Sequence, residues 1–234
     1  MGPSNTSFAG LPTDYFRFFR ELSENNNREW FEDNKPRFRA TVQEPLAALV
    51  EAVGPKLKSV SKHFVADPRL NGGSVFRIYR DVRFSKDKSP YKLHGAIQFR
   101  HARGKDAHAP GFYVHLAPGE VFYGGGVWTP PAPALLKIRE AIRDNAPAWQ
   151  KATQSKLFLK NFRELRGDSL SRPPKGFLKD DPMIEDLKRK SFFVMKEGTE
   201  ASAKKKAFVD DIGSAFHQSS PLMAFLCKAL DVPF

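Results

Sequence analysis

The feature that most constrains the fold is a change of hydrophobic period at Ser74. Before it, apolar residues recur at helical spacing, as Phe16, Phe19 and Leu22 do in the segment DYFRFFRELSE. From Ser74 to Trp128 the period becomes two. Turn residues divide that stretch into four expected strands, at 74–84, 94–101, 111–117 and 120–128. We therefore predict an α+β fold, with an antiparallel meander sheet packed against N-terminal and C-terminal helices.

Helix signals flank the expected sheet. Thr13 and Asn27 are candidate N-caps of two short helices, and Pro36 suits the first turn of a third that runs to about Leu57. Pro45 predicts a kink or a boundary within that third helix. Beyond the sheet we expect helices from Leu135, Asn145 and Pro182. The segment KLFLKNFREL suits either a strand or a helix, and we favour a strand after Ser155. We expect a further strand over KRKSFFVMKEG and helices at 201–216 and 219–230.

The composition supports one folded domain. Of the 234 residues, 41% are hydrophobic and 21 are phenylalanine, which is too apolar for intrinsic disorder. We expect residues 1–12 to be a flexible leader and residues 13–234 to form a single domain. A single cysteine, Cys227, excludes an internal disulfide, and the six histidines show no metal-ligand spacing, so we predict neither metal nor cofactor.

The charge is unevenly distributed along the chain. There are 38 Lys and Arg against 26 Asp and Glu, and residues 69–105 alone hold ten basic and two acidic residues. Such a basic protein favours an anionic small molecule or nucleic acid as partner. The sequence has no apolar signal segment or membrane-length apolar run, so we expect a cytoplasmic protein without a membrane partner and assign no oligomeric state.

Residues 74–84 point to a candidate site. Strict alternation puts Arg77, Tyr79, Asp81 and Arg83 on one face and the apolar residues Phe76, Ile78, Val82 and Phe84 on the other. If the neighbouring strands pair in matching register, the polar face would also carry Gln98, Arg100, Tyr113 and His115. A solvated sheet face has the same pattern, but arginines suit phosphate or carboxylate groups and tyrosines suit stacking. The candidate ligand-binding residues are Arg77, Tyr79, Arg83, Lys88, Tyr91 and Arg100.

Two residues of the segment have alternative roles. Asp81 would either form a salt bridge with its neighbouring arginines or act as a general base, and Tyr91 is the other candidate for proton transfer. Arg80 has the parity of the apolar face, so we predict a structural role with a carboxylate partner. The acidic residues of the early helices are the candidate partners: Glu29, Glu32 and Asp33. The turn SKDKSPYK is either an ordinary charged turn or a mobile basic loop that closes over a ligand.

The same residues carry a family resemblance. Arg77, Arg80, Asp81, Arg83, Phe84, Asp87, Lys88 and Tyr91 are similar to the RxxRDxRFxxDKxxY signature of the family catalogued as domain of unknown function 2461. The stretches FRFFRELSENNNREWF, GGGVWTP and LSRPPKGFLKDDP also resemble it, so the resemblance runs from about Tyr15 to Val209. It implies one full-length domain in a cytosolic protein of bacterial or fungal type, and it implies no particular activity.

Three functions remain open at this point. The first is a module that binds a phosphate-bearing ligand or nucleic acid through the arginine-rich sheet face. The second is an enzyme acting on a phosphorylated or carboxylated substrate, in which arginines and Lys88 clamp the substrate. The third is a structural or interaction protein in which the signature residues form a salt-bridge network.

Overall fold

The helical pattern before Ser74 folds as expected in the computed structural model, which describes residues 8–104 and 109–234. Helix α1 (Asp14–Glu24) is followed by α2 (Arg28–Asp33), which the Asn27 side chain caps by accepting from the Trp30 N–H at 3.0 Å. A continuous run then joins α3 (Lys35–Phe38), the π-helical turn η1 (Arg39–Gln43) and α4 (Glu44–Val60). Pro36 and Pro45 each lie in the first turn of a helix, where the missing N–H costs little. The kink or boundary predicted at Pro45 coincides with the change from the π-helical turn η1 to α4, within a run that stays helical.

The sheet is an antiparallel meander. Among the described residues it has four strands in the order β1 (Gly95–Arg100), β2 (Gly111–Ala117), β3 (Glu120–Val127) and β4 (Phe192–Glu197). The first three match the second to fourth expected strands, and β4 lies within KRKSFFVMKEG. The predicted α+β class and meander are confirmed.

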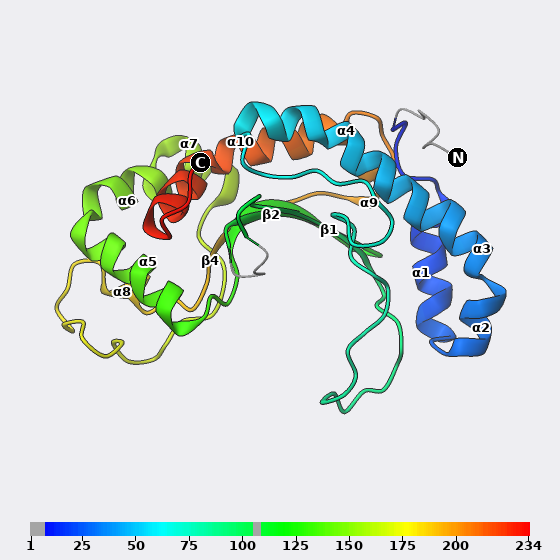
Figure 1. Cartoon of the computed structure of the whole chain (residues 1–234), viewed down its shortest axis with the longest axis horizontal. Coiled ribbons are helices and arrows are strands. Elements are labelled where there is room, and N and C mark those ends of the chain that lie inside the picture. Colours follow the sequence, from blue (N-terminus) through cyan, green and yellow to red (C-terminus); the bar gives the residue numbers. More distant parts are fainter. Residues whose placement is uncertain (1–7, 105–108) are drawn as a thin grey trace.

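The strand expected at 74–84 was wrong. Only single bridges form there, between Val75 and Ile97 and between Tyr79 and Tyr91. The backbone instead folds back on itself, since Arg80 N–H donates to the Pro90 carbonyl at 2.9 Å and Lys92 N–H to the Ile78 carbonyl at 2.8 Å. We call residues 76–92 the finger; it projects from the sheet at the end where α1 and α2 lie (Figure 1).

Helices complete the chain after β3. They are α5 (Ala132–Asp144), α6 (Ala146–Gln154), α7 (Lys156–Phe162), α8 (Ile184–Leu187), α9 (Glu200–Ala203) and α10 (Phe208–Ala229). The strand expected after Ser155 was wrong, because Ser155 caps α7 and the buried Phe158 and Phe162 are four residues apart on one helical face. The break expected between helices 201–216 and 219–230 was also wrong, because α10 continues without interruption through Ser219 and Pro221.

One face of the sheet is covered by α4 and α10 (Figure 1), and the other, concave face lines a hollow. The covered face supplies Phe99 and Phe112, which pack against Phe216 of α10 with ring centroids 5.6 and 4.6 Å away. A second apolar cluster surrounds the buried Trp149 where α5, α6 and α7 meet the β4 edge. The finger and the part containing α5 and α8 therefore stand on opposite sides of the hollow.

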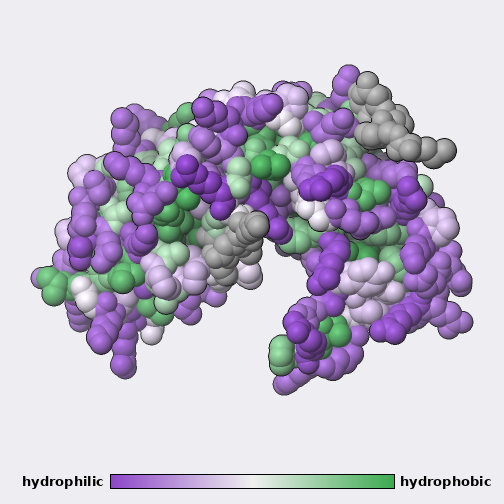
Figure 2. Space-filling view, in the orientation of Figure 1, coloured by the Kyte–Doolittle hydropathy of each residue, from purple (hydrophilic) through white to green (hydrophobic). Residues whose placement is uncertain are grey.

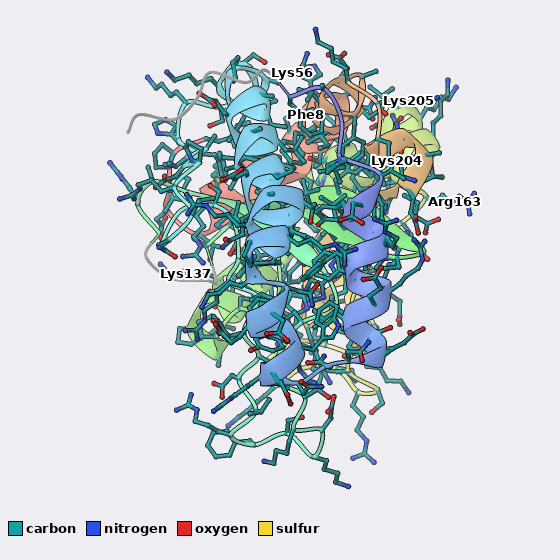
Figure 3. The ribbon with its side chains drawn as sticks, turned by 90° about the vertical axis from the view of Figure 1, so that its right-hand side faces the viewer. Phe8, Lys56, Lys137, Arg163, Lys204 and Lys205 are labelled. Carbon is teal, nitrogen blue, oxygen red and sulfur yellow. The ribbon has the colours of Figure 1, made fainter. Side chains whose placement is uncertain are left out.

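The N-terminal end of the described chain packs against the core. Phe8 and Leu11 are 5% and 3% exposed, and Leu11 N–H donates to the Ala203 carbonyl at 2.9 Å. Figure 3 shows Phe8 near Lys204, with α1 and the α3 to α4 run side by side in front of the sheet. Of the predicted flexible leader, residues 8–12 thus contain two buried side chains, and residues 1–7 lie outside the described range.

An α-helix needs about 20 mostly apolar residues to cross a bilayer. No helix in residues 8–104 and 109–234 is long and apolar enough to cross a membrane.

Candidate functional site

The concave face of the sheet forms an open groove of about 490 Å³. The space-filling view shows the hollow between the finger and the opposite part of the molecule (Figure 2). The groove is lined mainly by rings and apolar side chains, with a few cationic or polar groups. The lining includes Phe76, Lys92, His94, Gln98, Arg100, Tyr113, Phe122, Trp128, Phe193 and Met195.

Strand pairing places these side chains in rows across the sheet. Each row contains residues opposite one another on neighbouring strands, and their side chains share a face. The rows are Ala96, His115 and Phe122; Gln98, Tyr113, Gly124 and Met195; and Arg100, Gly111, Gly126 and Phe193. Gly124 in the second row and Gly111 and Gly126 in the third have no side chains, so the bottom of the groove is open at these positions. At Gly124 a Cβ would lie 1.9 Å from the Val194 carbonyl oxygen, so close packing of β3 on β4 requires glycine.

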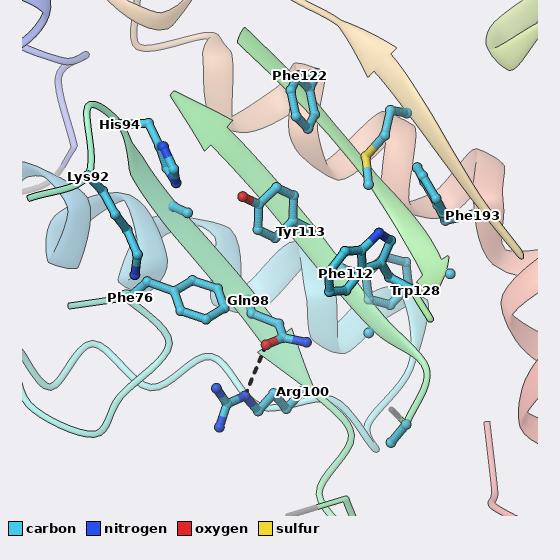
Figure 4. Close-up of a pocket in the computed structure, with 15 residues that line it drawn as sticks. Phe76, Lys92, His94, Gln98, Arg100, Phe112, Tyr113, Phe122, Trp128 and Phe193 are labelled. Atoms are coloured by element: carbon cyan, nitrogen blue, oxygen red, sulfur yellow. Dashed lines mark hydrogen bonds between the residues drawn. The ribbon is translucent and has the colours of Figure 1, made fainter. Parts of the chain in front are cut away.

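Two cations flank one aromatic ring at the finger side of the groove. The Lys92 Nζ lies 5.4 Å from the centroid of the Phe76 ring, and the Arg100 guanidinium carbon lies 5.9 Å from it. The Phe76 ring also meets Tyr113 edge-on, with centroids 6.3 Å apart. Figure 4 shows these four side chains gathered beside Gln98, with Trp128 and Phe193 across the groove.

Neither cation is neutralised by a neighbouring carboxylate in the described part of the chain. Lys92 Nζ donates to the Arg77 carbonyl at 2.8 Å, and Arg100 Nε donates to the Gln98 side-chain oxygen at 3.1 Å. Burial, followed by repulsion from Arg77, lowers the pKa of Lys92. Both side chains retain donors for an anionic ligand.

A polar chain lies at the other end of the groove floor. The Tyr113 hydroxyl is 3.0 Å from His115 Nδ1, and His115 Nε2 is 3.7 Å from a Glu120 carboxylate oxygen. The His94 ring lies beside it, with centroids 4.4 Å apart. Burial lowers the pKa of His115, while burial and then His115 lower that of His94 to about 4. Burial raises the pKa of Tyr113 to about 12. All three groups are therefore neutral at pH 7.

The finger is held by ion pairs of its own. Arg80 pairs with Asp87, and its guanidinium also donates to the Ser89 carbonyl at 3.2 Å. The prediction that Arg80 pairs with Glu29, Glu32 or Asp33 was therefore wrong, because the finger turns back and brings Asp87 to it. Hydrogen bonds from Ser89 and then Arg80 lower the pKa of Asp87.

Asp81 forms the salt bridge that was one of its two predicted roles. Its carboxylate lies 2.7 Å from the Arg83 guanidinium, and that hydrogen bond lowers its pKa to about 2. A carboxylate with so low a pKa is a weak general base near pH 7. Arg83 is three-quarters exposed, so the pair lies at the surface.

The two tyrosines of the finger lie at its base. Tyr91 is 2% exposed and stacks on Phe31 of α2, with centroids 4.1 Å apart. Its backbone N–H and carbonyl both bond to the Asn26 side chain, at 3.1 and 3.0 Å. Tyr79 is 48% exposed and lies against Tyr91, with centroids 5.6 Å apart. Tyr91 thus anchors the finger and has almost no surface for a ligand.

The predicted common surface is only partly present. Gln98, Arg100, Tyr113 and His115 do share the concave face, as strand alternation indicated. Arg77, Tyr79 and Arg83 do not, because the 74–84 segment is not a strand in register with β1. Of the candidate ligand residues, Arg100 lines the groove, Tyr91 is buried, and Arg77, Tyr79, Arg83 and Lys88 are on the finger.

Sequence reasoning missed several groove residues. Phe76 was assigned to the core by its parity, but it is 37% exposed and faces the groove. Lys92 ends the basic turn SKDKSPYK and His94 begins the strand expected at 94–101, but neither was among the candidate site residues. Trp128, which is 69% exposed at the end of β3, follows three glycines; that combination of bare backbone and one large ring was an available signal.

The described residues include neither a metal-ligating cluster nor an accessible cysteine. No cluster of three or more His, Cys, Asp or Glu side chains there could hold a metal ion. Cys227 is buried within α10, and burial raises its pKa to about 12, so its thiolate is not available as a nucleophile.

The chain resembles a known protein family over most of its length. No curated protein and no solved structure matches the chain. A protein family described as conserved hypothetical protein (DUF2461) matches residues 14–225, from the start of α1 to near the end of α10. This match covers the sheet, the finger and both sides of the groove, and the chain therefore belongs to the conserved hypothetical protein family DUF2461.

Proposed function

We propose that the concave groove binds a phosphate-bearing ligand with a flat ring, such as a nucleotide. The observation that carries the proposal is the placement of Lys92 and Arg100 within 5.4 and 5.9 Å of the Phe76 ring centroid, at the edge of an aromatic groove. The cationic side chains suit a phosphate group, and the aromatic side chains suit a flat ring. A single ligand that carries a phosphate and a ring would therefore contact the whole site.

Electrostatics supports an anion rather than a cation. Arg100 presents a planar fork of donors, and Lys92 lies close to Arg77, so an arriving negative charge would relieve their mutual repulsion. The net charge of +12 also raises the local concentration of anions near the surface. A negatively charged ligand is thus favoured before any contact forms.

The groove also fits a ring. Trp128, which is largely exposed, surrounds with Tyr113, Phe122 and Phe193 a floor lowered by Gly111, Gly124 and Gly126. A volume of about 490 Å³ lies within the range of small-molecule sites. The protein would then serve as a binding module, or as the binding part of an enzyme.

A second candidate, catalysis in the same groove, rests on the Tyr113 and His115 contact. If His115 carries its proton on Nε2 toward Glu120, its Nδ1 accepts from the Tyr113 hydroxyl at 3.0 Å. His115 would then assist proton removal from Tyr113 or from a substrate hydroxyl in its place. His115→Gln would abolish turnover and leave ligand affinity within about twofold, whereas a binding module shows no turnover to lose.

The third candidate is a salt-bridge network without a ligand. It rests on the Arg80 and Asp87 pair and the Asp81 and Arg83 pair, which brace the finger. Such surface pairs contribute little stability, because solvent and salt screen the attraction between their charges. The network alone leaves the aromatic groove without a role, so we favour ligand binding.

Titration with AMP, GMP, UMP and inorganic phosphate, followed by Trp128 fluorescence and calorimetry, tests the proposal. Trp128 lines the groove, so a bound ring is expected to quench its emission. Arg100→Ala and Lys92→Ala should each weaken nucleotide binding roughly tenfold, the value of one charge-assisted hydrogen bond. Phe76→Ala should weaken it about fivefold through lost stacking.

Arg39→Ala is the matched control, since Arg39 is exposed, pairs with Glu44 and does not line the groove. It should leave affinity unchanged. Trp128→Phe should remove the optical signal and keep the calorimetric one. Absence of heat and quenching with every nucleotide at millimolar concentration would overturn the proposal.

A further inference from the structure

Phe84, on the finger, is the most exposed large apolar side chain of the described residues. It is 95% exposed, whereas Trp128 and Leu178 are 69% and 73% exposed. The guanidinium carbon of Arg83 lies 5.8 Å from the centre of its ring. An aromatic ring held in water beside a cation is poised for a partner that offers both a flat apolar face and negative charge.

The finger that presents Phe84 is internally braced. Arg80 pairs with Asp87, Lys88 Nζ donates to the Val82 carbonyl at 3.0 Å, and the stack of Tyr91 on Phe31 holds the base. These contacts lie on both sides of Phe84 in the sequence. The ring is therefore displayed by a defined loop.

The cations of the finger are continuous with those of the groove. The finger has six basic and two acidic residues, and Asp81 and Asp87 are both paired with arginines of the finger itself. Arg77, Arg83, Lys86 and Lys88 are exposed, and the Arg77 carbonyl accepts from the groove cation Lys92. A line of positive charge thus runs from the groove to the end that carries Phe84.

We propose that the ligand is a strand of single-stranded nucleic acid, whose phosphates follow this line of charge while its bases stack on the groove rings and on Phe84. The proposal deepens the proposed function and rests on it. Alternating phosphates and bases match a path of alternating cations and rings, which is how single strands are bound without base-specific contacts.

Other occupants match fewer of these features. A mononucleotide satisfies Lys92, Arg100 and the groove rings, and leaves the finger cations and Phe84 without a role. A duplex hides the faces of its bases within the stack, so the groove rings could not reach them. An anionic membrane would match Phe84 and the finger cations but would leave the concave floor unused.

Fluorescence anisotropy of the full chain with labelled dT20 and rU20, between 50 and 300 mM salt, tests the inference, and its two arms separate DNA from RNA. We expect both oligonucleotides to bind at least tenfold more tightly than dTMP or UMP. Phe84→Ala should weaken oligonucleotide binding about tenfold and leave mononucleotide binding unchanged. Lys86→Ala should reduce the slope of log affinity against log salt by about 0.7, one phosphate contact.

Leu157→Ala is the matched control, because Leu157 is an exposed apolar residue on α7 and does not line the groove. It should change neither affinity. Mononucleotide binding without tighter oligonucleotide binding would overturn this inference and leave the proposed function standing. If neither mononucleotides nor oligonucleotides bind, both this inference and the proposed function are overturned. Phe84-dependent binding to phosphatidylglycerol vesicles, with no Phe84 effect on oligonucleotides, would also overturn it in favour of a lipid surface.

Discussion

The rings of Phe31 and Tyr91 stack with their centroids 4.1 Å apart and their planes inclined by 23°. Phe31 belongs to α2 and Tyr91 is the second-last residue of the finger, so the stack joins the helical layer to the base of the finger. The Asn26 side chain closes the same junction by bonding to both backbone groups of Tyr91. This junction sets where the finger leaves the sheet and hence one wall of the groove.

Removal of the ring at this junction should destabilise the protein. Tyr91→Ala is expected to lower the free energy of unfolding by about 3–5 kcal/mol, as for other buried aromatic residues. Tyr91→Phe keeps the stack and should cost less than about 1 kcal/mol. Urea denaturation of both variants measures the difference. Equal losses would show that the hydroxyl, rather than the stack, carries the role of Tyr91.

Loss of the Arg80 and Asp87 pair should loosen the finger without unfolding the protein. Solvent screens this surface pair, so Arg80→Ala should raise the population of molecules with an open finger by no more than roughly fivefold. The rate of chymotrypsin cleavage after Phe84 reports that population. Arg77→Ala, which breaks no ion pair of the finger, is the control. Identical cleavage rates for both variants would contradict a bracing role for Arg80.

Stability should fall in mild acid because of His94. Its pKa of about 4 lies below the ordinary 6.5, so between these values the unfolded chain binds more protons than the folded one. The free energy of unfolding therefore decreases as pH falls from about 6.5 to about 4, with a slope of at most about 1.4 kcal/mol per pH unit. Chemical denaturation at several pH values in this range should show that the free energy of unfolding of the His94→Gln variant falls less steeply with pH than that of the unchanged protein. An unchanged slope would contradict the burial of a neutral His94.

Two glycine-to-alanine substitutions should change the stability of the protein in opposite directions. At Gly124 a new Cβ would meet the backbone of β4, so Gly124→Ala is expected to cost about 1–3 kcal/mol by overpacking. At Gly54, within α4, the nearest atom is Ala66 Cβ at 3.4 Å, and alanine should stabilise the helix by about 0.5–1 kcal/mol. The melting temperatures of the two variants, compared with that of the unchanged protein, measure both effects. Tolerance of alanine at Gly124 would mean that β3 and β4 can separate without loss.

Local patterns were sufficient for most of the fold. The period of two placed β1, β2 and β3 and put Gln98, Arg100, Tyr113 and His115 on one face, because successive side chains of a paired strand must alternate. Caps and prolines placed the N-terminal helices. The same rule failed after Ser74, since charged side chains and carbonyls of the finger satisfy one another and no neighbouring strand enforces alternation.

The sequence by itself determined the family, the α+β class, the meander and the basic stretch from which the site is built. Only the tertiary structure decided that Phe76 and Lys92 face a groove, that Tyr91 is an anchor, and that Arg80 pairs with Asp87. The physical reason is that a strand's faces follow from bonds between near neighbours, whereas the direction of a loop depends on distant contacts. Here those contacts are the stack on Phe31 and the bonds from Asn26, about 60 residues earlier in the chain.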